Sequence, residues 1–275
     1  MNILIALGVA AAAVCVAWAM QNIVLALAGE SLAWPWQFPV HRPLLRWTSR
    51  VTVHTVWLII LIGIPLALGI RPLDWLNQEF PTPVPWREMA IGFAVMFFTP
   101  CLIYLTYLKA GWVSFEPKFE QRVRRAKLFR RFLGPLPLAA LEEGVFRGIF
   151  LELLLQSLPS SVAFTALAIA LSSAVFASVH FVKPVKGKPV WQAAYGYFIV
   201  GCLFGLAYIV GGRSLWLPIV VHSTAVFVIE VARLYLVFRA PRWLIGFPGS
   251  PQSGLVGSVF VLVAGTGLLC SIRSV

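Results

Sequence analysis

Long runs of apolar residues, more than any single motif, constrain what this chain can fold into. A membrane-spanning helix needs about 20 consecutive, mostly apolar residues, and eight segments of the sequence meet this requirement. The predicted spans are residues 3–28, 51–70, 89–108, 134–156, 161–181, 192–211, 214–236 and 254–272. They leave little chain for a soluble domain. We therefore predict an all-α fold: a polytopic membrane protein with about eight transmembrane helices.

The composition supports a membrane protein, because the chain has too few polar residues to cover a soluble globule. Of its 275 residues, 60% are hydrophobic and only 12% are charged, whereas an average soluble domain is about 25% charged. No Lys or Arg precedes the first span. That span is also longer than the roughly 7–15-residue apolar core of a signal peptide. We therefore expect it to be retained as a helix.

The distribution of the net charge of +12 predicts how the chain is oriented. Basic residues gather in the first, third, fifth and seventh loops: Arg42, Arg46, Arg50; Lys109, Lys118, Arg122, Arg124, Arg125, Lys127, Arg130, Arg131; Lys183, Lys186, Lys188; Arg239 and Arg242. Charges nearly cancel in the second loop, and the fourth has none. The positive-inside rule then places the basic loops in the cytoplasm. We expect an integral protein of the cell's inner (plasma) membrane with both termini outside, and Arg213 and Arg273 as exceptions.

The third loop predicts contact with the lipid bilayer. Phe115, Phe119, Val123 and Phe132 alternate with basic residues at near-helical spacing, which is typical of an amphipathic helix lying on the inner membrane surface. We favour this interpretation over nucleic-acid binding. The predicted organisation has three parts. Residues 1–133 form a three-helix membrane region with this cytoplasmic basic segment, 134–238 a core of four helices, and 239–275 a loop and the last span.

The span at 134–156 carries charges that a lipid-facing helix would not tolerate. They are Glu142, Glu143, Arg147 and Glu152, and each would cost roughly 2.5–3.5 kcal/mol at the bilayer centre. Glu143 and Arg147 are four residues apart and can pair on one helical face. Glu142 has no basic residue three or four positions further on. A desolvated carboxylate suits a general acid or base, but a structural polar cluster between helices remains an equal alternative from this segment alone.

Two histidines on other spans favour a catalytic site. His180 ends the fifth predicted span and His222 lies within the seventh. Together with Glu142 they could activate a water molecule, or bind Zn²⁺ with one open position. The sequence leaves open whether this site uses zinc or is metal-free. We interpret His41 and His54, in or beside the first basic loop, as structural or solvated.

Several other intramembrane chemistries lack their residues. Asp74 is the only aspartate, so a pair of membrane aspartates is excluded. The sequence contains neither the HExxH of zinc metalloproteases nor a GxSxG nucleophile elbow, and it lacks the sequence context of a rhomboid serine site. The four cysteines lie in apolar spans, where cysteine behaves as a small apolar residue, and none belongs to a CxxC pair. We therefore expect no disulfide and no cysteine metal site. The cysteines are Cys15, Cys101, Cys202 and Cys270.

Three motifs in order resemble a known family. EExxxR is formed by Glu142, Glu143 and Arg147, and FxxxH by Phe176 and His180. The stretch "GYFIVGCLFGLAYIVGGRSLWLPIVVH" resembles a Gly-rich helix, a turn and a histidine helix. These are marks of the CPBP intramembrane proteases, which comprise type II CAAX prenyl endopeptidases and bacterial bacteriocin-processing and self-immunity relatives. The resemblance covers about residues 134–235.

The resemblance implies an endopeptidase that cleaves a membrane-associated protein or peptide, with prenylated CAAX proteins as one possible class. It implies that Glu142 activates the water, that His180 and His222 complete the site, and that Glu143 and Arg147 support it. One position departs from the family. The asparagine usually found one turn after the last histidine is replaced by Val226. Two alternatives therefore stay open: a non-catalytic relative that acts as an immunity or assembly factor, and a transporter or proton relay. The sequence does not determine the oligomeric state.

The predicted spans place the three residues at different depths. His180 lies near the cytoplasmic end of its span, while Glu142 lies about 12 Å into the preceding one at 1.5 Å per residue. Their convergence requires a cavity open to the cytoplasm or span boundaries several residues from those predicted.

Overall fold

The computed structural model describes residues 2–29, 43–117, 121–181 and 190–273, and most of them are helical. The helices of the first half are α1 (Asn2–Leu27), α2 (Pro43–Ala67), α3 (Pro72–Glu79), α4 (Trp86–Lys109) and α5 (Gln121–Leu133). Those of the second half are α6 (Pro135–Glu143), the π-helix η1 (Gly144–Leu151), α7 (Glu152–Ser157), α8 (Val162–Phe181), α9 (Val190–Val210), α10 (Trp216–Tyr235), α11 (Arg242–Ile245), the 3₁₀-helix η2 (Pro251–Ser253) and α12 (Leu255–Arg273). The two short strands are β1 (Val113–Phe115) and β2 (Leu236–Phe238). The predicted all-α class is confirmed.

Fewer helices than predicted are both long and apolar enough to cross a membrane. In the described part of the chain five qualify, namely α4, α8, α9, α10 and α12. A sixth is added if the end of α2 and α3, which are bent by 106°, count as one broken span. The predicted span at 134–156 is helical, but it carries four charges and is divided into α6, η1 and α7. The chain is a polytopic membrane protein, although the count of eight spans is not reached.

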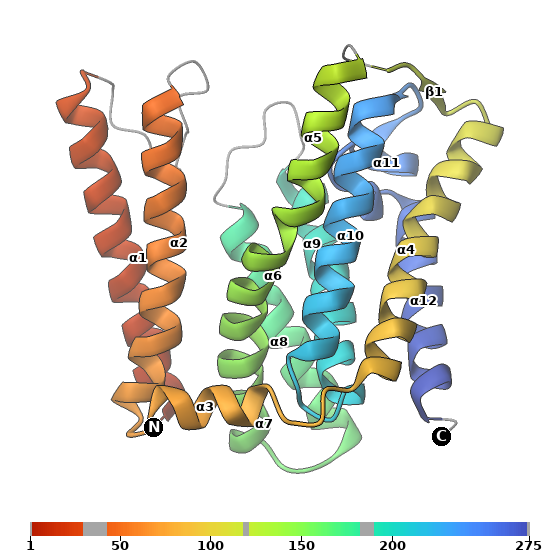
Figure 1. Ribbon diagram of the computed structural model, residues 1–275. Helices are drawn as coiled ribbons and strands as arrows, with labels where there is room; N and C mark the ends of the chain where they lie inside the picture. Colours follow the sequence, from red (N-terminus) through yellow and green to blue (C-terminus); the bar gives the residue numbers. More distant parts are fainter. Residues whose placement is uncertain (1, 30–42, 118–120, 182–189, 274–275) are drawn as a thin grey trace.

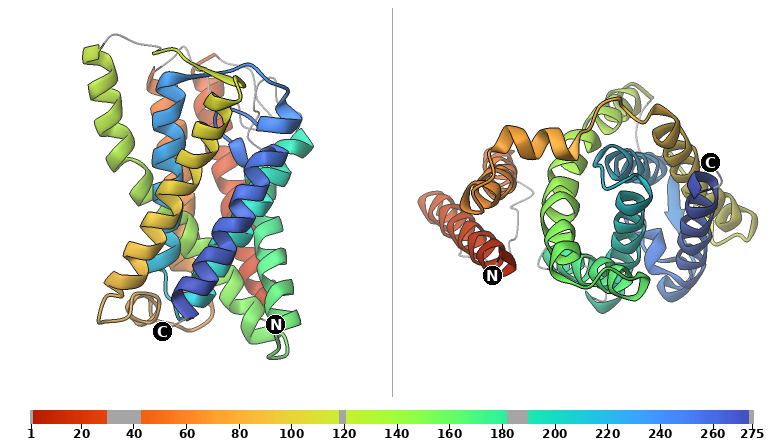
Figure 2. Two further views of the ribbon diagram at one scale, coloured as in Figure 1. Left: turned by 90° about the vertical axis from the view of Figure 1, so that its right-hand side faces the viewer. Right: turned by 90° about the horizontal axis from the view of Figure 1, so that it is seen from below.

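The helices form a main bundle with a helix pair beside it. α1 packs along α2, and this pair stands to one side of the other helices (Figures 1 and 2). α3 runs across one end of the bundle and leads to α4 (Figure 1). Within the bundle, α8 packs against α9 and η1, and α10 packs against α4, α6 and α9. The apolar core lies among these elements and includes Phe146, Phe176, Phe204 and Leu217.

The two ends of the bundle differ in charge as the sequence predicts. The start of α1 and the end of α12 lie at the same end as α3 (Figure 1). The opposite end carries α5 and an antiparallel ribbon in which β1 pairs with β2, with Ser114 opposite Val237. Arg239 of that ribbon's end pairs with Glu116. His41 and the lysines of the fifth loop lie outside the described residues, whereas His54 is a half-buried residue of α2.

The basic helix α5 does not lie across the end of the bundle as expected. It continues steeply from α6 toward the basic end (Figure 1) and contacts α10. Arg131 explains this direction, because it pairs with the Glu230 carboxylate at 3.5 Å and donates a hydrogen bond to the Glu230 carbonyl. Phe132 packs edge-on against Phe227, with ring centroids 5.5 Å apart. α5 is thus held against α10 while Phe129 stays exposed.

Candidate active site

The charged segment of the sixth helix contains a π-helix, which the sequence did not predict. α6 ends at Glu143, and the next eight residues, Gly144–Leu151, are wound as η1 before α7 resumes α-helical winding. π-helical turns are rare and occur frequently at functional sites. Neighbouring elements bind carbonyl groups of this segment: Ser172 of α8 donates to the Phe146 carbonyl at 2.7 Å. The widened turn follows directly on the two glutamates.

Arg147 is fully buried and is neutralised by Glu143, as their spacing predicts. One guanidinium nitrogen donates to Glu143 Oε1 at 3.2 Å, and Nε lies 3.2 Å from Oε2. A second nitrogen donates to the Gly201 carbonyl of α9 at 2.8 Å. The guanidinium also lies 4.9 Å from the centre of the Phe176 ring, within the range of a cation–π interaction. Arg147 therefore joins η1 to α8 and α9 at the centre of the bundle.

Glu143 has a second contact that its sequence position did not indicate. Its Oε1 lies 2.7 Å from Nδ1 of His222, which is 79 residues further along the chain. A carboxylate can only accept hydrogen bonds, so Nδ1 of His222 carries the proton. Nε2 of His222 then presents its lone pair to the opposite side, where Glu142 lies. Glu143 thus orients the histidine in addition to pairing with Arg147.

His180 is oriented in the same sense by its own helix. Its Nδ1 lies 2.9 Å from the Phe176 carbonyl one turn earlier. Because a carbonyl is only an acceptor, this contact places the proton on Nδ1, and Nε2 faces Glu142. Two aromatic rings pack against the imidazole: the Phe176 centroid lies at 4.3 Å and the Tyr197 centroid at 4.5 Å.

Glu142 lies between the two histidines. Its Oε1 is 3.8 Å from Nε2 of His180, and its Oε2 is 3.7 Å from Nε2 of His222. The carboxylate is buried and is contributed by α6, while the histidines come from α8 and α10. Both separations are longer than a direct hydrogen bond. The structure therefore brings the three predicted residues together, with Glu143 and Arg147 directly behind them.

The expected difference in depth between Glu142 and His180 is resolved by where their helices end. α5 precedes α6 and occupies the height toward the basic end, so α6 begins inside the bundle rather than at its surface (Figure 1). Glu142 is the second-last residue of α6 and His180 the second-last of α8. The two helices run in opposite directions, yet these ends meet at the same level. The boundaries predicted for the segment that contains Glu142, 134–156, agree closely with α6 to α7, Pro135–Ser157; the level at which this segment begins is what the sequence did not show.

A search for a metal site gave no candidate among the described residues: no group of three His, Cys, Asp or Glu side chains is arranged there to hold a metal ion. The chemistry considered below is derived from side chains of the chain itself.

A second buried polar cluster lies at the opposite end, around Glu152. Its carboxylate receives hydrogen bonds or ion pairs from Arg213 at 2.9 and 3.0 Å. The Tyr208 hydroxyl lies 3.2 Å from Glu152 and 3.1 Å from the fully buried Glu79. This hydroxyl has one proton for two carboxyl groups, so one of them must itself be protonated for both contacts to be hydrogen bonds. Glu152 neutralises the charge of Arg213. This ion pair explains why Arg213 can be an exception to the predicted distribution of basic residues.

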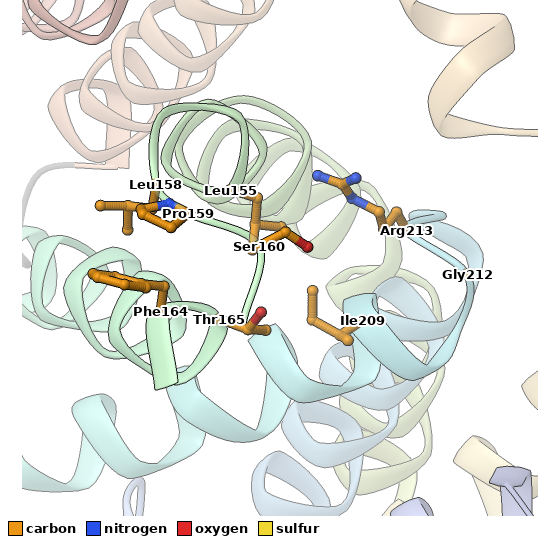
Figure 3. Close-up of a pocket in the computed structure, with 9 residues that line it drawn as sticks. All are labelled: Leu155, Leu158, Pro159, Ser160, Phe164, Thr165, Ile209, Gly212 and Arg213. Atoms are coloured by element: carbon orange, nitrogen blue, oxygen red, sulfur yellow. The ribbon is translucent and has the colours of Figure 1, made fainter. Parts of the chain in front are cut away.

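A cavity of about 360 Å³ lies beside that cluster and is lined by the turn between α7 and α8 and by the end of α9, but not by Glu142, His180 or His222. Figure 3 shows Leu155, Phe164 and Ile209 around it, with the Arg213 guanidinium at its rim. Ser160 and Thr165 supply hydroxyls, but the lining holds no histidine or carboxylate. It therefore lacks the groups needed for acid–base chemistry, and the candidate active site remains the one around Glu142.

Comparison with known proteins agrees with this location. Residues 126–228 match the family model described as type II CAAX prenyl endopeptidase Rce1-like. Comparisons with curated proteins and with solved structures found no match. The matched region contains Glu142, Glu143, Arg147, His180 and His222. The match and the apolar helices establish an integral membrane protein whose Rce1-like region belongs to the CPBP family of CAAX-type intramembrane proteases.

Proposed function

We propose that the protein is an intramembrane endopeptidase that hydrolyses a peptide bond of a membrane-associated protein, with prenylated CAAX proteins as the substrate class that its family suggests. The observation that carries this proposal is the position of the buried Glu142 carboxylate between the Nε2 atoms of His180 and His222. Three helical elements contribute to this arrangement, and packing of each side chain fixes its direction. Such convergence is what a general base and its partners require.

The reaction follows from these positions. A water molecule held between Glu142 and the histidines gives one proton to the carboxylate, and its oxygen attacks the carbonyl carbon of the scissile peptide. The carbonyl π electrons move to oxygen and form a tetrahedral oxyanion. Collapse of this intermediate breaks the C–N bond, and the departing nitrogen takes the proton from Glu142. The products are a carboxylic acid and an amine, and the Glu142 carboxylate is regenerated.

Glu143 and Arg147 position this machinery without contacting the water. Glu143 fixes the ring of His222 through Nδ1, and Arg147 balances the buried negative charge of Glu143. Support of this kind for a catalytic side chain matters because small displacements of reacting groups lower the rate strongly. Their role in the proposal is orientation and charge balance.

Cleavage of a farnesylated, internally quenched peptide with a CAAX sequence tests the proposal in proteoliposomes that contain the purified protein. Glu142→Gln keeps the size of the side chain but cannot accept the proton, so we expect the rate to fall about 10²–10⁴-fold. Glu116→Gln is the matched control, because Glu116 is exposed at the basic end, and it should cleave at the unmodified rate. Undiminished cleavage by Glu142→Gln would contradict the proposal.

One observation favours a second candidate, a non-catalytic relative that acts as an immunity or membrane-protein assembly factor. Val226, one turn after His222, cannot donate a hydrogen bond to an oxyanion. Loss of one such donor lowers the rate of acyl-transfer enzymes about 10²–10³-fold. A non-catalytic factor would show no cleavage by the unmodified protein and would keep its biological activity in Glu142→Gln.

The orientation in the membrane is part of the same proposal. The basic helix α5 and the β1–β2 ribbon lie at one end of the bundle, and the start of α1 and the end of α12 lie at the other (Figure 1). We place the basic end in the cytoplasm, and hence both termini outside, in the inner (plasma) membrane of the cell.

A further inference from the structure

We propose that the hydroxyl of Tyr197 donates the hydrogen bond that stabilises the oxyanion formed at this site. This inference rests on the proposed peptidase function and deepens it, because it assigns a specific residue to a step for which Val226 supplies no donor. Tyr197 lies on α9, an element that contributes none of the residues considered so far as reacting groups.

The ring of Tyr197 forms part of the wall of the site. It stacks on the His180 imidazole, with centroids 4.5 Å apart and planes inclined by 30°. Its ring centre is 6.4 Å from that of Phe176, which also packs against His180. The phenol is therefore adjacent to one of the two histidines that face Glu142, and stacking limits where its hydroxyl can point.

The helix that carries Tyr197 packs against the helix that lacks the donor. α9 contacts α10 as well as α8, and on α10 Val226 lies one turn beyond His222. Tyr197 thus brings a phenol from α9 next to His180, at a site where α10 presents only an isopropyl group one turn after its histidine.

The other donors near Glu142 are engaged or point away. Arg147 is held by Glu143 and by the Gly201 carbonyl. The N–H groups of His180 and His222 are directed to the Phe176 carbonyl and to Glu143. By contrast, the Tyr197 hydroxyl forms no hydrogen bond with any group in the described parts of the chain. Its proton is therefore available to a bound substrate.

The hydroxyl would act without transferring its proton. When the oxygen from water attacks the scissile carbon, negative charge develops on the former carbonyl oxygen, and the Tyr197 O–H donates a hydrogen bond to it. The proton of the water still goes to Glu142 and then to the departing nitrogen. When the intermediate collapses, the carbonyl re-forms and the hydrogen bond weakens, so the contact stabilises the transition state more than the bound substrate.

Tyr197→Phe tests the inference, because it removes the hydroxyl and keeps the ring that stacks on His180. For the farnesylated quenched peptide we expect kcat to fall about 10²–10³-fold, the typical loss of one oxyanion donor, with little change in KM. Tyr195→Phe is the control, because Tyr195 lies on the same helix with an exposed side chain, and it should leave kcat unchanged. An unchanged kcat in Tyr197→Phe would overturn the inference, since a purely structural ring predicts that result.

A binding measurement decides the inference independently of turnover. A phosphinate version of the farnesylated peptide carries a tetrahedral anion at the position of the scissile bond. We expect Tyr197→Phe to lose affinity for the phosphinate peptide by a factor comparable to its loss in kcat, with unchanged affinity for the parent peptide. Equal affinity of both proteins for the phosphinate peptide, or no binding by either, overturns the inference. Absence of cleavage by the unmodified protein instead overturns the proposed peptidase function.

Discussion

Glu143 shows how one buried side chain can serve two neighbours. It accepts hydrogen bonds from both Arg147 and His222, and it is fully buried. A buried ion pair contributes little net stability compared with apolar groups of the same shape, yet breaking it by removing one partner is costly. Keeping both charges of the Glu143–Arg147 pair is therefore required for stability. The same Glu143 carboxylate also orients His222.

This requirement gives a prediction for stability. Glu143→Gln leaves the Arg147 guanidinium buried without a countercharge, and we expect the free energy of unfolding to fall by about 3–5 kcal/mol. Equilibrium unfolding in detergent micelles, followed by tryptophan fluorescence, measures the change. The double variant Glu143→Gln, Arg147→Gln removes both charges and should be less destabilised than the single variant. A single variant as stable as the unmodified protein would show that the pair is not held as the structure has it.

At the scale of elements, the π-helix η1 and the close contact of α8 with α9 determine where the side chains of the candidate site lie. η1 follows Glu143 directly, so Arg147 and Phe146 project from a widened turn. Arg147 can reach the Gly201 carbonyl because α9 approaches α8 closely at that point. A β-carbon on Gly201 would lie 3.0 Å from Cβ of Ser173 and 3.3 Å from the Phe176 ring. The absence of a side chain at Gly201 therefore determines how near His180 comes to the other residues.

Gly201→Ala tests this contact. The added methyl group should push α8 away from α9, and since Phe176 and His180 belong to α8, we expect slower peptide cleavage together with a lower unfolding midpoint. Gly267→Ala is the control, because a β-carbon there meets no atom within 4 Å. Cleavage and midpoint equal to those of the control would mean that the two helices adjust without moving the site.

At the scale of the whole molecule, the bundle has two polar clusters at different depths with different chemistry. The one around Glu142 combines a carboxylate with two imidazoles, whereas the one around Glu152 combines two glutamates, Tyr208 and Arg213. The second joins α3, α7 and α9 at the end where the chain termini lie. It fixes the crossing helix α3 to the bundle and neutralises the charge of Arg213.

The proposed orientation predicts which positions are accessible from each side of the membrane. In a variant without the four native cysteines, Ser160→Cys places a thiol in the exposed turn between α7 and α8, at the end assigned to the outside. Arg242→Cys places one at the basic end. We expect a membrane-impermeant maleimide to label position 160 in intact cells, and position 242 only after the membrane is permeabilised. The reverse labelling pattern would show that the protein has the opposite orientation in the membrane.

Much of this molecule follows from local sequence properties. Apolar length determined the membrane fold, because burying an unpaired backbone in lipid is so costly that a long apolar run must be helical. Helical spacing determined the Glu143–Arg147 pair, since residues four apart are neighbours on a helix. The motif order identified the three residues around which the site forms. Among the described residues fewer spans are found than the eight predicted, and the π-helical interruption after Glu143 was not predicted, because hydropathy does not show where a charged helix is interrupted.

Tertiary packing decided the contacts that depend on distant segments. The family resemblance assigns Glu143 and His222 to one site, but the sequence does not show that they form a hydrogen bond across 79 residues, nor does it direct Tyr197 of α9 toward His180 of α8. These contacts arise where three helices approach, and their approach depends on side-chain volume, as at Gly201, and on the π-helical turn after Glu143. The sequence alone determined that buried glutamate and histidine residues lie in a helical membrane protein. Only the packing of the helices decided which atoms of those residues face one another, because direction and distance are properties of the assembled bundle.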